Sequence, residues 1–339
     1  MTLVLDYLVK RLILLLSLIF LLSSCTSNTE IIEQYKGSIM GTTYKISFIK
    51  PKESIEEKNL FSILQLVDKE MSTYDESSLL TKVNSSTKEN WVVISTNLAE
   101  VLKFSKEVCI DTDGAFDISI GKIINSWGFG PSKLNLIPSK EEIKKFQSYV
   151  GCNAFELDFQ NKKVRRNANV YLDLSAVAKG YAVDLVAKYL KSKDINNYLV
   201  EVGGELKVKG KKINKPWKVG IENPLQPGKP ILTLVTNGFN ELSLATSGNY
   251  RNFIEDNGNK ISHTFDPTSG LSVSHNLASV SVVSESVMKS DALATALNVM
   301  GLERGLEFAN LNNIKALFIL VDDNKVLTYP SKEFKTLLN

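Results

Sequence analysis

A carboxylate and a hydroxyl placed four residues apart are the first candidates for chemistry in this chain. Asp291 and Thr295 lie in the apolar segment 290–300, whose pattern predicts a helix that ends at Gly301. Side chains four apart share one face of a helix, so these two oxygens could bind one hard cation such as Mg²⁺. The alternative is that Asp291 caps the helix after Ser290 and that Thr295 is an ordinary surface residue.

A second candidate segment joins an acid to a lysine. The short apolar run 170–174 predicts a strand, and a helix is expected from Ser175 to Lys191. Asp173 would lie at the end of the strand and Lys179 one turn into the helix, where N–H groups and a cation could receive the phosphates of a dinucleotide. The alternative is a plain strand-to-helix joint with a solvated Lys179.

Histidines limit the possible metal and acid–base chemistry. The chain has two, His263 and His275, which excludes a polyhistidine site and leaves oxygen atoms as the expected metal ligands. His263 precedes Asp266, and a histidine near an acid can serve as a general base. Either His263 or Asp266 could therefore accept a proton, although a structural role for His263 stays open. His275 lies outside this motif and is expected to be a bystander.

Apolar and aromatic side chains beside an acceptor suggest a site for a flat ring. Met40, Tyr74 and Phe116, with Asp117, are of the types that line isoalloxazine or adenine sites. Aromatic residues also build hydrophobic cores, and for Phe116 the core is a serious alternative. No GxGxxG, Walker-type, HExxH or CxxC pattern occurs, which excludes the common dinucleotide, phosphate-loop and zinc motifs.

Nine short segments set Asp, Thr, Ser or Lys among Gly and Ala, where a backbone can approach a ligand closely. They are residues 38–44 (SIMGTTY), 71–74 (MSTY), 114–121 (GAFDISIG), 127–131 (WGFGP), 173–184 (DLSAVAKGYAVD), 202–205 (VGGE), 245–250 (ATSGNY), 263–267 (HTFDP) and 291–296 (DALATA). Taken in this order they resemble the motif series of the ApbE family, over about Gly37 to Gly301. The chain departs from the family at Lys122, where the family usually has proline, and this affects the course of that loop.

The resemblance implies an activity and its site residues. ApbE enzymes use FAD and Mg²⁺ to attach FMN to a threonine of another protein, with release of AMP. By resemblance, Asp291, Thr295 and the main-chain oxygen of Ala176 hold Mg²⁺, and His263 or Asp266 is the base. The positions expected to contact FAD are Met40, Tyr74, Ala115, Phe116, Asp117, Asp173, Lys179 and Phe265.

Acceptors are implied in the same way. They are flavoprotein subunits of membrane complexes such as Na⁺-translocating NADH:quinone reductase or the Rnf complex. Two alternatives remain beside the transferase. One is an FAD pyrophosphatase, in which water replaces threonine and FMN and AMP are released. The other is a flavin-binding lipoprotein without turnover.

The elements that must position these residues follow an N-terminal segment of a different kind. Lys10 and Arg11 precede the eleven-residue run 12–22, which is apolar except for one serine and ends in Leu-Ser-Ser-Cys at Cys25. This layout predicts a lipoprotein signal peptide over residues 1–24, with lipid on Cys25. A membrane-spanning helix is the alternative, but it needs roughly 20 apolar residues. We therefore expect a protein lipid-anchored to the inner membrane on its periplasmic side, with a tether at 25–35 and an ApbE-like domain at 36–339.

Hydrophobic patterns predict an α+β fold with largely antiparallel sheets and packed helices, because strands and helices alternate without a regular βαβ rhythm. The predicted strands are 40–49, 198–202, 205–208, 217–221, 231–236 and 278–283. Further helices are predicted at 55–71, 98–110 and 139–149, where Ser139 and Glu142 form a capping-box pattern. A last helix and strand are expected to end near Val321.

Bulk composition adds few constraints. The 339 residues carry a formal charge of +3 and could form one large or two modest domains. No block of basic residues alternates with aromatics, so no nucleic-acid partner is expected. Cys109 and Cys152 remain beside the lipidated cysteine. They could pair in an oxidising compartment, but two buried free thiols are the favoured interpretation.

Overall fold

The computed structural model describes Arg11 and residues 30–51, 53–131, 137–236, 241–249, 253–256 and 259–338. Apart from Arg11, the expected signal peptide lies outside the described residues, as does Cys25. Among the residues that are described, no helix has the length and apolar character needed to cross a membrane. The first strand begins at Ile32, so the last residues assigned to the tether pair within the domain instead.

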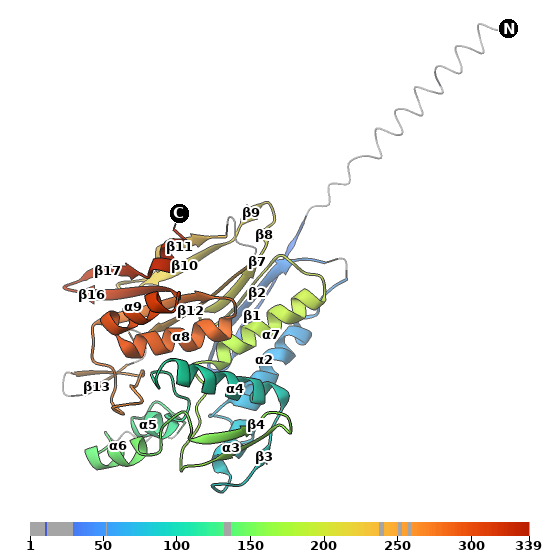
Figure 1. The fold of residues 1–339 in the computed structure, drawn as a ribbon. Coiled ribbons are helices and arrows are strands. Elements are labelled where there is room, and N and C mark those ends of the chain that lie inside the picture. The colour runs from blue at the N-terminus through green and yellow to red at the C-terminus, as the bar shows by residue number, and fades with distance from the viewer. Residues whose placement is uncertain are drawn as a thin grey trace, which may run out of the picture. The chain divides into compact units, whose positions relative to one another are not determined.

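An eight-stranded antiparallel sheet forms the centre of the domain. Figure 1 shows this sheet with helices packed on it. Every pair of neighbouring strands runs antiparallel, which confirms the predicted fold class. In spatial order the strands are β1 (Ile32–Ile39), β2 (Thr42–Ile49), β6 (Tyr198–Val202), β7 (Glu205–Lys209), β12 (Glu241–Gly248), β15 (Leu277–Ser284), β16 (Lys315–Asp322) and β17 (Lys325–Pro330).

Two helices cover one face of this sheet. Helix α7 (Ala178–Ser192) packs on β6 and β7, and α8 (Val287–Met300) packs on β12 and β15. Helices α2 (Glu57–Met71) and α4 (Thr96–Asp111) form a further layer against them (Figure 1). The two inner helices cross so closely at Gly180 that an added Cβ would lie 2.5 Å from the Val287 carbonyl oxygen. Only glycine fits this crossing.

A hairpin and a short helix cover the opposite face. The hairpin consists of β10 (Lys218–Asn223) and β11 (Gln226–Val235), and the helix is α10 (Lys332–Lys335). Alternate residues of β16 serve the two cores: Phe318 packs in the core under α7 and α8, whereas Leu317 packs in the core under the hairpin. This alternation follows from the two-residue period of a strand.

The remaining elements form smaller units around the main sheet. They are α3 (Leu79–Ser85), α5 (Gly121–Ser126), α6 (Lys140–Gln147), α9 (Leu302–Leu311), and the strands β3 (Val92–Val93), β4 (Phe155–Asp158), β5 (Lys163–Arg166), β8 (Lys211–Lys212), β9 (Lys215–Pro216), β13 (Phe253–Asp256) and β14 (Asn259–Ser262). The capping box that the sequence predicts at Ser139 is present at the start of α6.

One predicted element is wrong. The segment 170–174 forms no strand, because only Tyr171 pairs, in an isolated bridge with Ile120. The following helix begins at Ala178 rather than at Ser175. The carboxylate of Asp173 accepts a hydrogen bond from the Ser175 amide at 2.8 Å, which stabilises a turn at this place.

The two cysteines of the domain are bonded to each other. Cys109 and Cys152 form a disulfide with a Cα–Cα distance of 5.6 Å and a sequence separation of 43 residues. The favoured expectation of two free thiols is therefore wrong. The pairing depends on how the end of α4 approaches the loop before β4, which the spacing of cysteines in the sequence does not determine.

Candidate active site

A cleft of about 1440 Å³ lies beside the start of α7 and along one face of α8. It is larger than the roughly 300–1,000 Å³ of sites for drug-sized ligands, so a dinucleotide is a suitable occupant. The structure brings most of the predicted site residues to it: Met40, Tyr74, Ala115, Phe116, Asp117, Asp173, Ala176, Lys179, His263, Phe265, Asp291 and Thr295.

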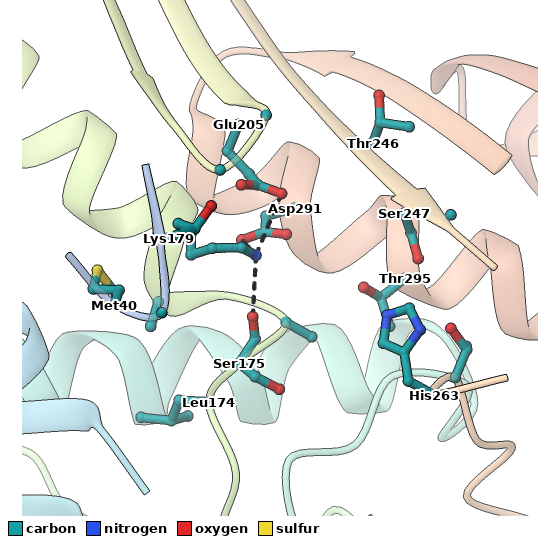
Figure 2. A pocket seen from close by; sticks show the side chains of 18 of the residues that line it. Met40, Leu174, Ser175, Lys179, Glu205, Thr246, Ser247, His263, Asp291 and Thr295 are labelled. Carbon is teal, nitrogen blue, oxygen red and sulfur yellow. Dashed lines mark hydrogen bonds and ion pairs between the residues drawn. The ribbon is translucent and has the colours of Figure 1, made fainter. Parts of the chain in front are cut away.

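Lys179 occupies the centre of a charged cluster in this cleft (Figure 2). Its Nζ atom lies 3.3 Å from Oε1 of Glu205 and 3.8 Å from Oδ2 of Asp291, and it donates to the Ser175 carbonyl at 3.3 Å. Burial alone would lower the pKa of Lys179, but the two carboxylates outweigh it and raise that pKa. The lysine therefore stays a cation that can bind a phosphate group.

Burial acts in the opposite sense on the two acids. It raises the pKa of Glu205 and the pKa of Asp291, and in both cases the charge of Lys179 opposes the rise. Glu205 is 3% exposed, and its second carboxylate oxygen, Oε2, has no hydrogen-bond partner among the described residues. A buried carboxylate oxygen without a partner is a position where a bound cation would find a ligand.

The start of α8 excludes the capping role considered for Asp291. The N-cap is Ser286, whose hydroxyl accepts from the Lys289 amide at 3.2 Å. Asp291 therefore lies in the second turn, where it is 5% exposed, and Thr295 follows one turn later along the cleft. The carboxylate and the hydroxyl share one helix face, as their spacing predicts.

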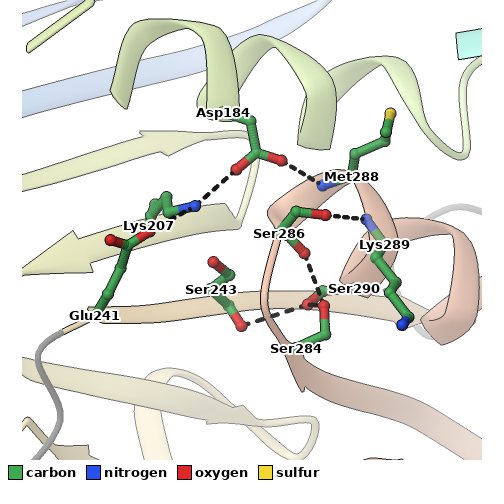
Figure 3. A network of polar contacts seen from close by, with 9 residues as sticks. All are labelled: Asp184, Lys207, Glu241, Ser243, Ser284, Ser286, Met288, Lys289 and Ser290. Atoms are coloured by element: carbon green, nitrogen blue, oxygen red, sulfur yellow. Dashed lines mark hydrogen bonds and ion pairs between the residues drawn. The ribbon is translucent and has the colours of Figure 1, made fainter. Parts of the chain in front are cut away.

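A partly buried polar network anchors the start of α8 (Figure 3). The Met288 amide donates to Oδ2 of Asp184 in α7 at 2.9 Å, and Oδ1 of the same carboxylate accepts from Lys207 of β7 at 3.1 Å. Lys207 also lies 2.7 Å from Glu241 of β12. The network ties the sheet to both helices that carry the charged cluster.

The donor set beside this cluster fits a hard divalent cation. In a continuous helix the Gly180 amide would donate to the Ala176 carbonyl, but here it donates to Oδ2 of Asp291 at 3.1 Å. The main-chain oxygen of Ala176, three residues before Lys179, is thereby left for another partner. Within the described ranges no group of three or more His, Cys, Asp and Glu side chains could hold a metal, so hydroxyl and main-chain oxygens would have to contribute.

The residues expected to contact FAD differ in their exposure. Tyr74 is 66% exposed, and its hydroxyl donates to the Phe129 carbonyl at 2.9 Å, which leaves its ring at the cleft surface. Phe116 is only 2% exposed and packs in the main core. Its side chain is therefore part of the hydrophobic core, which was the alternative to a role in ring binding. Asp117 is buried, and this burial raises its pKa.

The two candidate bases differ in their position relative to the cleft. His263 lines the cleft, with its ring centroid 6.4 Å from that of Phe129 (Figure 2). Asp266 is not among the residues that line the cleft, and its carboxylate accepts from the Thr268 amide at 2.9 Å in a turn. His263 is therefore the better placed of the two candidate bases in this structure, and the catalytic role of either residue stays a prediction. His275 contacts the Asn298 carbonyl instead of the cleft.

Sequence reasoning missed Glu205 as a member of the charged cluster. The signal was present, because the acid directly follows Gly203 and Gly204, whose φ angles of 64° and 105° form a tight turn at the cleft. Lys122, the departure from the family pattern, lies in α5 with its Nζ 5.9 Å from the centre of the Tyr149 ring. It does not line the cleft.

Comparison with known proteins gives one consistent result. A family model described as the ApbE family matches residues 40–318. An FAD:protein FMN transferase of Haemophilus influenzae is 37% identical, with 93% of this chain and 94% of that protein covered. The protein of the same name from Vibrio cholerae is 36% identical, over 96% of this chain and 98% of its own length.

Solved structures agree with these sequence matches. The flavin transferase ApbE from Vibrio cholerae superposes with a TM-score of 0.81 at 34% identity, over 91% of this chain and 99% of that chain. The ApbE protein from Thermotoga maritima superposes with the same TM-score of 0.81 at 26% identity, over 91% of this chain and 100% of that chain.

Proposed function

The chain belongs to the ApbE family, and on this basis we propose that it is an Mg²⁺-dependent FAD:protein FMN transferase. It would move FMN from FAD to a threonine of an acceptor protein and release AMP. The observation that carries the proposal is the arrangement of Lys179 between Glu205 and Asp291, beside a main-chain oxygen that the helix does not use. This arrangement suits a pyrophosphate and its metal ion.

Different residues of the chain would bind the phosphates, the nucleoside and flavin parts of FAD, and the metal ion. Lys179 would bind a phosphate oxygen, because its charge is maintained by two buried carboxylates. Asp173, Asp117 and the exposed ring of Tyr74 would hold the nucleoside and flavin parts of FAD. Mg²⁺, bound by Asp291, Thr295 and the Ala176 carbonyl, would supply positive charge against the pyrophosphate and the departing AMP.

The transfer itself exchanges one P–O bond for another. The threonine hydroxyl oxygen forms a bond to the phosphorus of the FMN part, and the bond from that phosphorus to the bridging oxygen breaks. AMP leaves with the bridging oxygen. His263 would accept the threonine proton, since it is the imidazole that lines the cleft. Most of the rate enhancement would come from positioning and charge.

Location and acceptors are part of the proposal. The signal-peptide pattern ending at Cys25 supports a lipid-anchored protein on the periplasmic side of the inner membrane. The disulfide between Cys109 and Cys152 supports it independently, because such bonds persist in oxidising compartments. The proposed acceptors are flavoprotein subunits of Na⁺-translocating NADH:quinone reductase or Rnf-type complexes, whose acceptor threonines would have to lie on that side.

Mass spectrometry of an acceptor domain tests the activity. The full chain in mild detergent is incubated with FAD, Mg²⁺ and the acceptor, and a mass gain of one FMN is expected. EDTA and Asp291→Ala should abolish the gain. Asp322→Ala is the matched control, because it removes an exposed carboxylate of β16 that does not line the cleft.

Other outcomes point to the two alternatives. Release of FMN and AMP without modification of any acceptor, threonine peptides included, would show a pyrophosphatase. FAD binding that survives Asp291→Ala, with no product in either assay, would show a flavin-binding protein without turnover.

A further inference from the structure

A fully buried asparagine lies on the helix face that carries the proposed metal ligands. Asn298 of α8 is 0% exposed and follows Asp291 by seven residues and Thr295 by three. Residues with these spacings lie on one side of a helix. Asn298 is outside the motif segments, and it does not line the cleft.

Asn298 is bonded through all of its side-chain polar atoms to the end of β12. Its Oδ1 accepts from Nδ2 of Asn249 at 2.9 Å, and its Nδ2 donates to Oδ1 of Asn249 at 3.2 Å. The same Nδ2 lies 3.0 Å from the hydroxyl of Ser247, which lines the cleft. The amide pair therefore fixes the strand end against α8.

The chain of hydrogen bonds continues to both neighbours of His263. The Ser262 hydroxyl donates to Oδ1 of Asn249 at 2.9 Å and accepts from the Thr264 amide at 3.1 Å. The Ser272 hydroxyl donates to the Ser262 carbonyl at 2.8 Å. The backbone on each side of His263 is thus connected to α8 through Asn249 and Asn298.

Asn298 and Asn249 are reciprocal hydrogen-bond partners. Burying an amide costs free energy that its hydrogen bonds offset, and an apolar side chain at 298 would leave the Asn249 amide without two of its bonds. What an asparagine adds is a fixed geometry between two segments that have no covalent link near the site.

We propose that Asn298 is a positioning residue for FMN transfer, which holds the His263 segment in register with Thr295 on α8. The proposal rests on the proposed function, because it assigns His263 the proton-transfer role. Asn298 touches neither FAD nor the acceptor; it acts through Asn249 and Ser262. A displacement of about 1 Å at a reacting group lowers rates roughly 100-fold, so loss of the amide should reduce kcat far more than it reduces FAD binding.

A double-mutant cycle tests the proposal through activity. Asn298→Ala should lower kcat for FMN transfer by about 10- to 100-fold, with the half-saturating FAD and Mg²⁺ concentrations within about two-fold of the parent. In a His263→Ala background the same substitution should have little further effect, because the group that it positions is already gone. The proposal would be overturned if Asn298→Ala lowered kcat by the same factor in the parent and in the His263→Ala background.

A matched control comes from the same helix. Ser290 is also 0% exposed, and its hydroxyl bonds to Ser284 and to the Ser243 carbonyl rather than to the His263 segment (Figure 3). Any effect of Ser290→Ala on kcat should be the same with and without His263. If Asn298→Ala does not fold, Asn298→Asp keeps the shape and the Oδ1 acceptor and replaces it in the cycle.

Nuclear magnetic resonance tests the proposal without activity, so its failure is distinguishable from failure of the proposed function. The chain has two histidines, and ¹³C-labelled rings give two signals that His263→Ala assigns. Asn298→Ala should shift or broaden the His263 signal. The His275 signal should change little, because its 2.8 Å contact is to the main-chain oxygen of Asn298, which alanine retains. An unchanged His263 signal, or equal changes in both, would refute the inference.

Discussion

Removal of the disulfide should lower the stability of the domain by an amount that follows from the loop it closes. Cys109 and Cys152 are 43 residues apart. Cross-linking a loop of this length removes about 13 cal/mol/K of entropy from the unfolded chain, which is about 4 kcal/mol at 25 °C. For a folded part of about 300 residues the unfolding entropy is about 0.6 kcal/mol/K, so Tm should fall by about 6 °C.

The bond also borders the segment expected to contact FAD. The Cys109 carbonyl accepts from the Gly114 amide at 2.8 Å, and the Gly151 amide donates to the Ser119 hydroxyl at 3.0 Å. Both links hold the ends of the Ala115–Ser119 stretch. Loss of the disulfide should therefore raise the half-saturating FAD concentration by a few-fold at a temperature where the domain is still folded, with a smaller effect on kcat.

Calorimetry of the full chain in detergent, with and without a phosphine reductant, measures the first effect. Cys109→Ser/Cys152→Ser should reproduce the Tm of the reduced chain, and reductant should not change the double variant further. A Tm that moves by less than about 1 °C in both experiments would refute the loop-entropy argument.

Three further predictions concern the helices and the C-terminus. Asp291→Asn, which removes the charge but keeps the shape, should lower FMN transfer at least 100-fold and weaken the Mg²⁺ dependence, as a magnesium titration of the rate measures. Gly180→Ala places a Cβ 2.5 Å from the Val287 carbonyl oxygen and should destabilise the domain by about 1–3 kcal/mol in urea unfolding, with loss of activity. Ser331→Ala removes the buried hydroxyl that accepts from the Ala316 and Phe334 amides; it should cost about 1–3 kcal/mol in the same unfolding measurement and leave kcat unchanged.

Local patterns predicted the elements that local energetics control. The helix at 98–110 corresponds to α4, and the strand at 198–202 matches β6 in both bounds. The capping box at Ser139 is likewise a local interaction. The strand expected at 170–174 is wrong because its apolar residues are buried between other elements with a single isolated bridge, from Tyr171 to Ile120, and apolar composition alone does not distinguish this situation from a strand within a sheet.

The candidate site was predictable as a set of residues but not as an arrangement. Spacing placed Asp291 and Thr295 on one helix face and Lys179 in the first turn of a helix, and the family resemblance assigned these residues to Mg²⁺ and FAD. Glu205 and Asn298 were missed because their importance comes from contacts with residues far away in the sequence. The same reason explains why the sequence left the cysteine pairing open and could not choose between His263 and Asp266.

The sheet order has a consequence for biosynthesis. Strand β2 pairs with β6, and β7 pairs with β12, so neighbours in the sheet leave the ribosome far apart in time. The residues that line the cleft extend in the sequence from Met40 to Val299. A nascent chain whose α8 has not yet left the ribosome therefore has no complete site. If the chain crosses the membrane unfolded, it cannot capture FAD on the way, and its first encounter with the dinucleotide takes place where it folds.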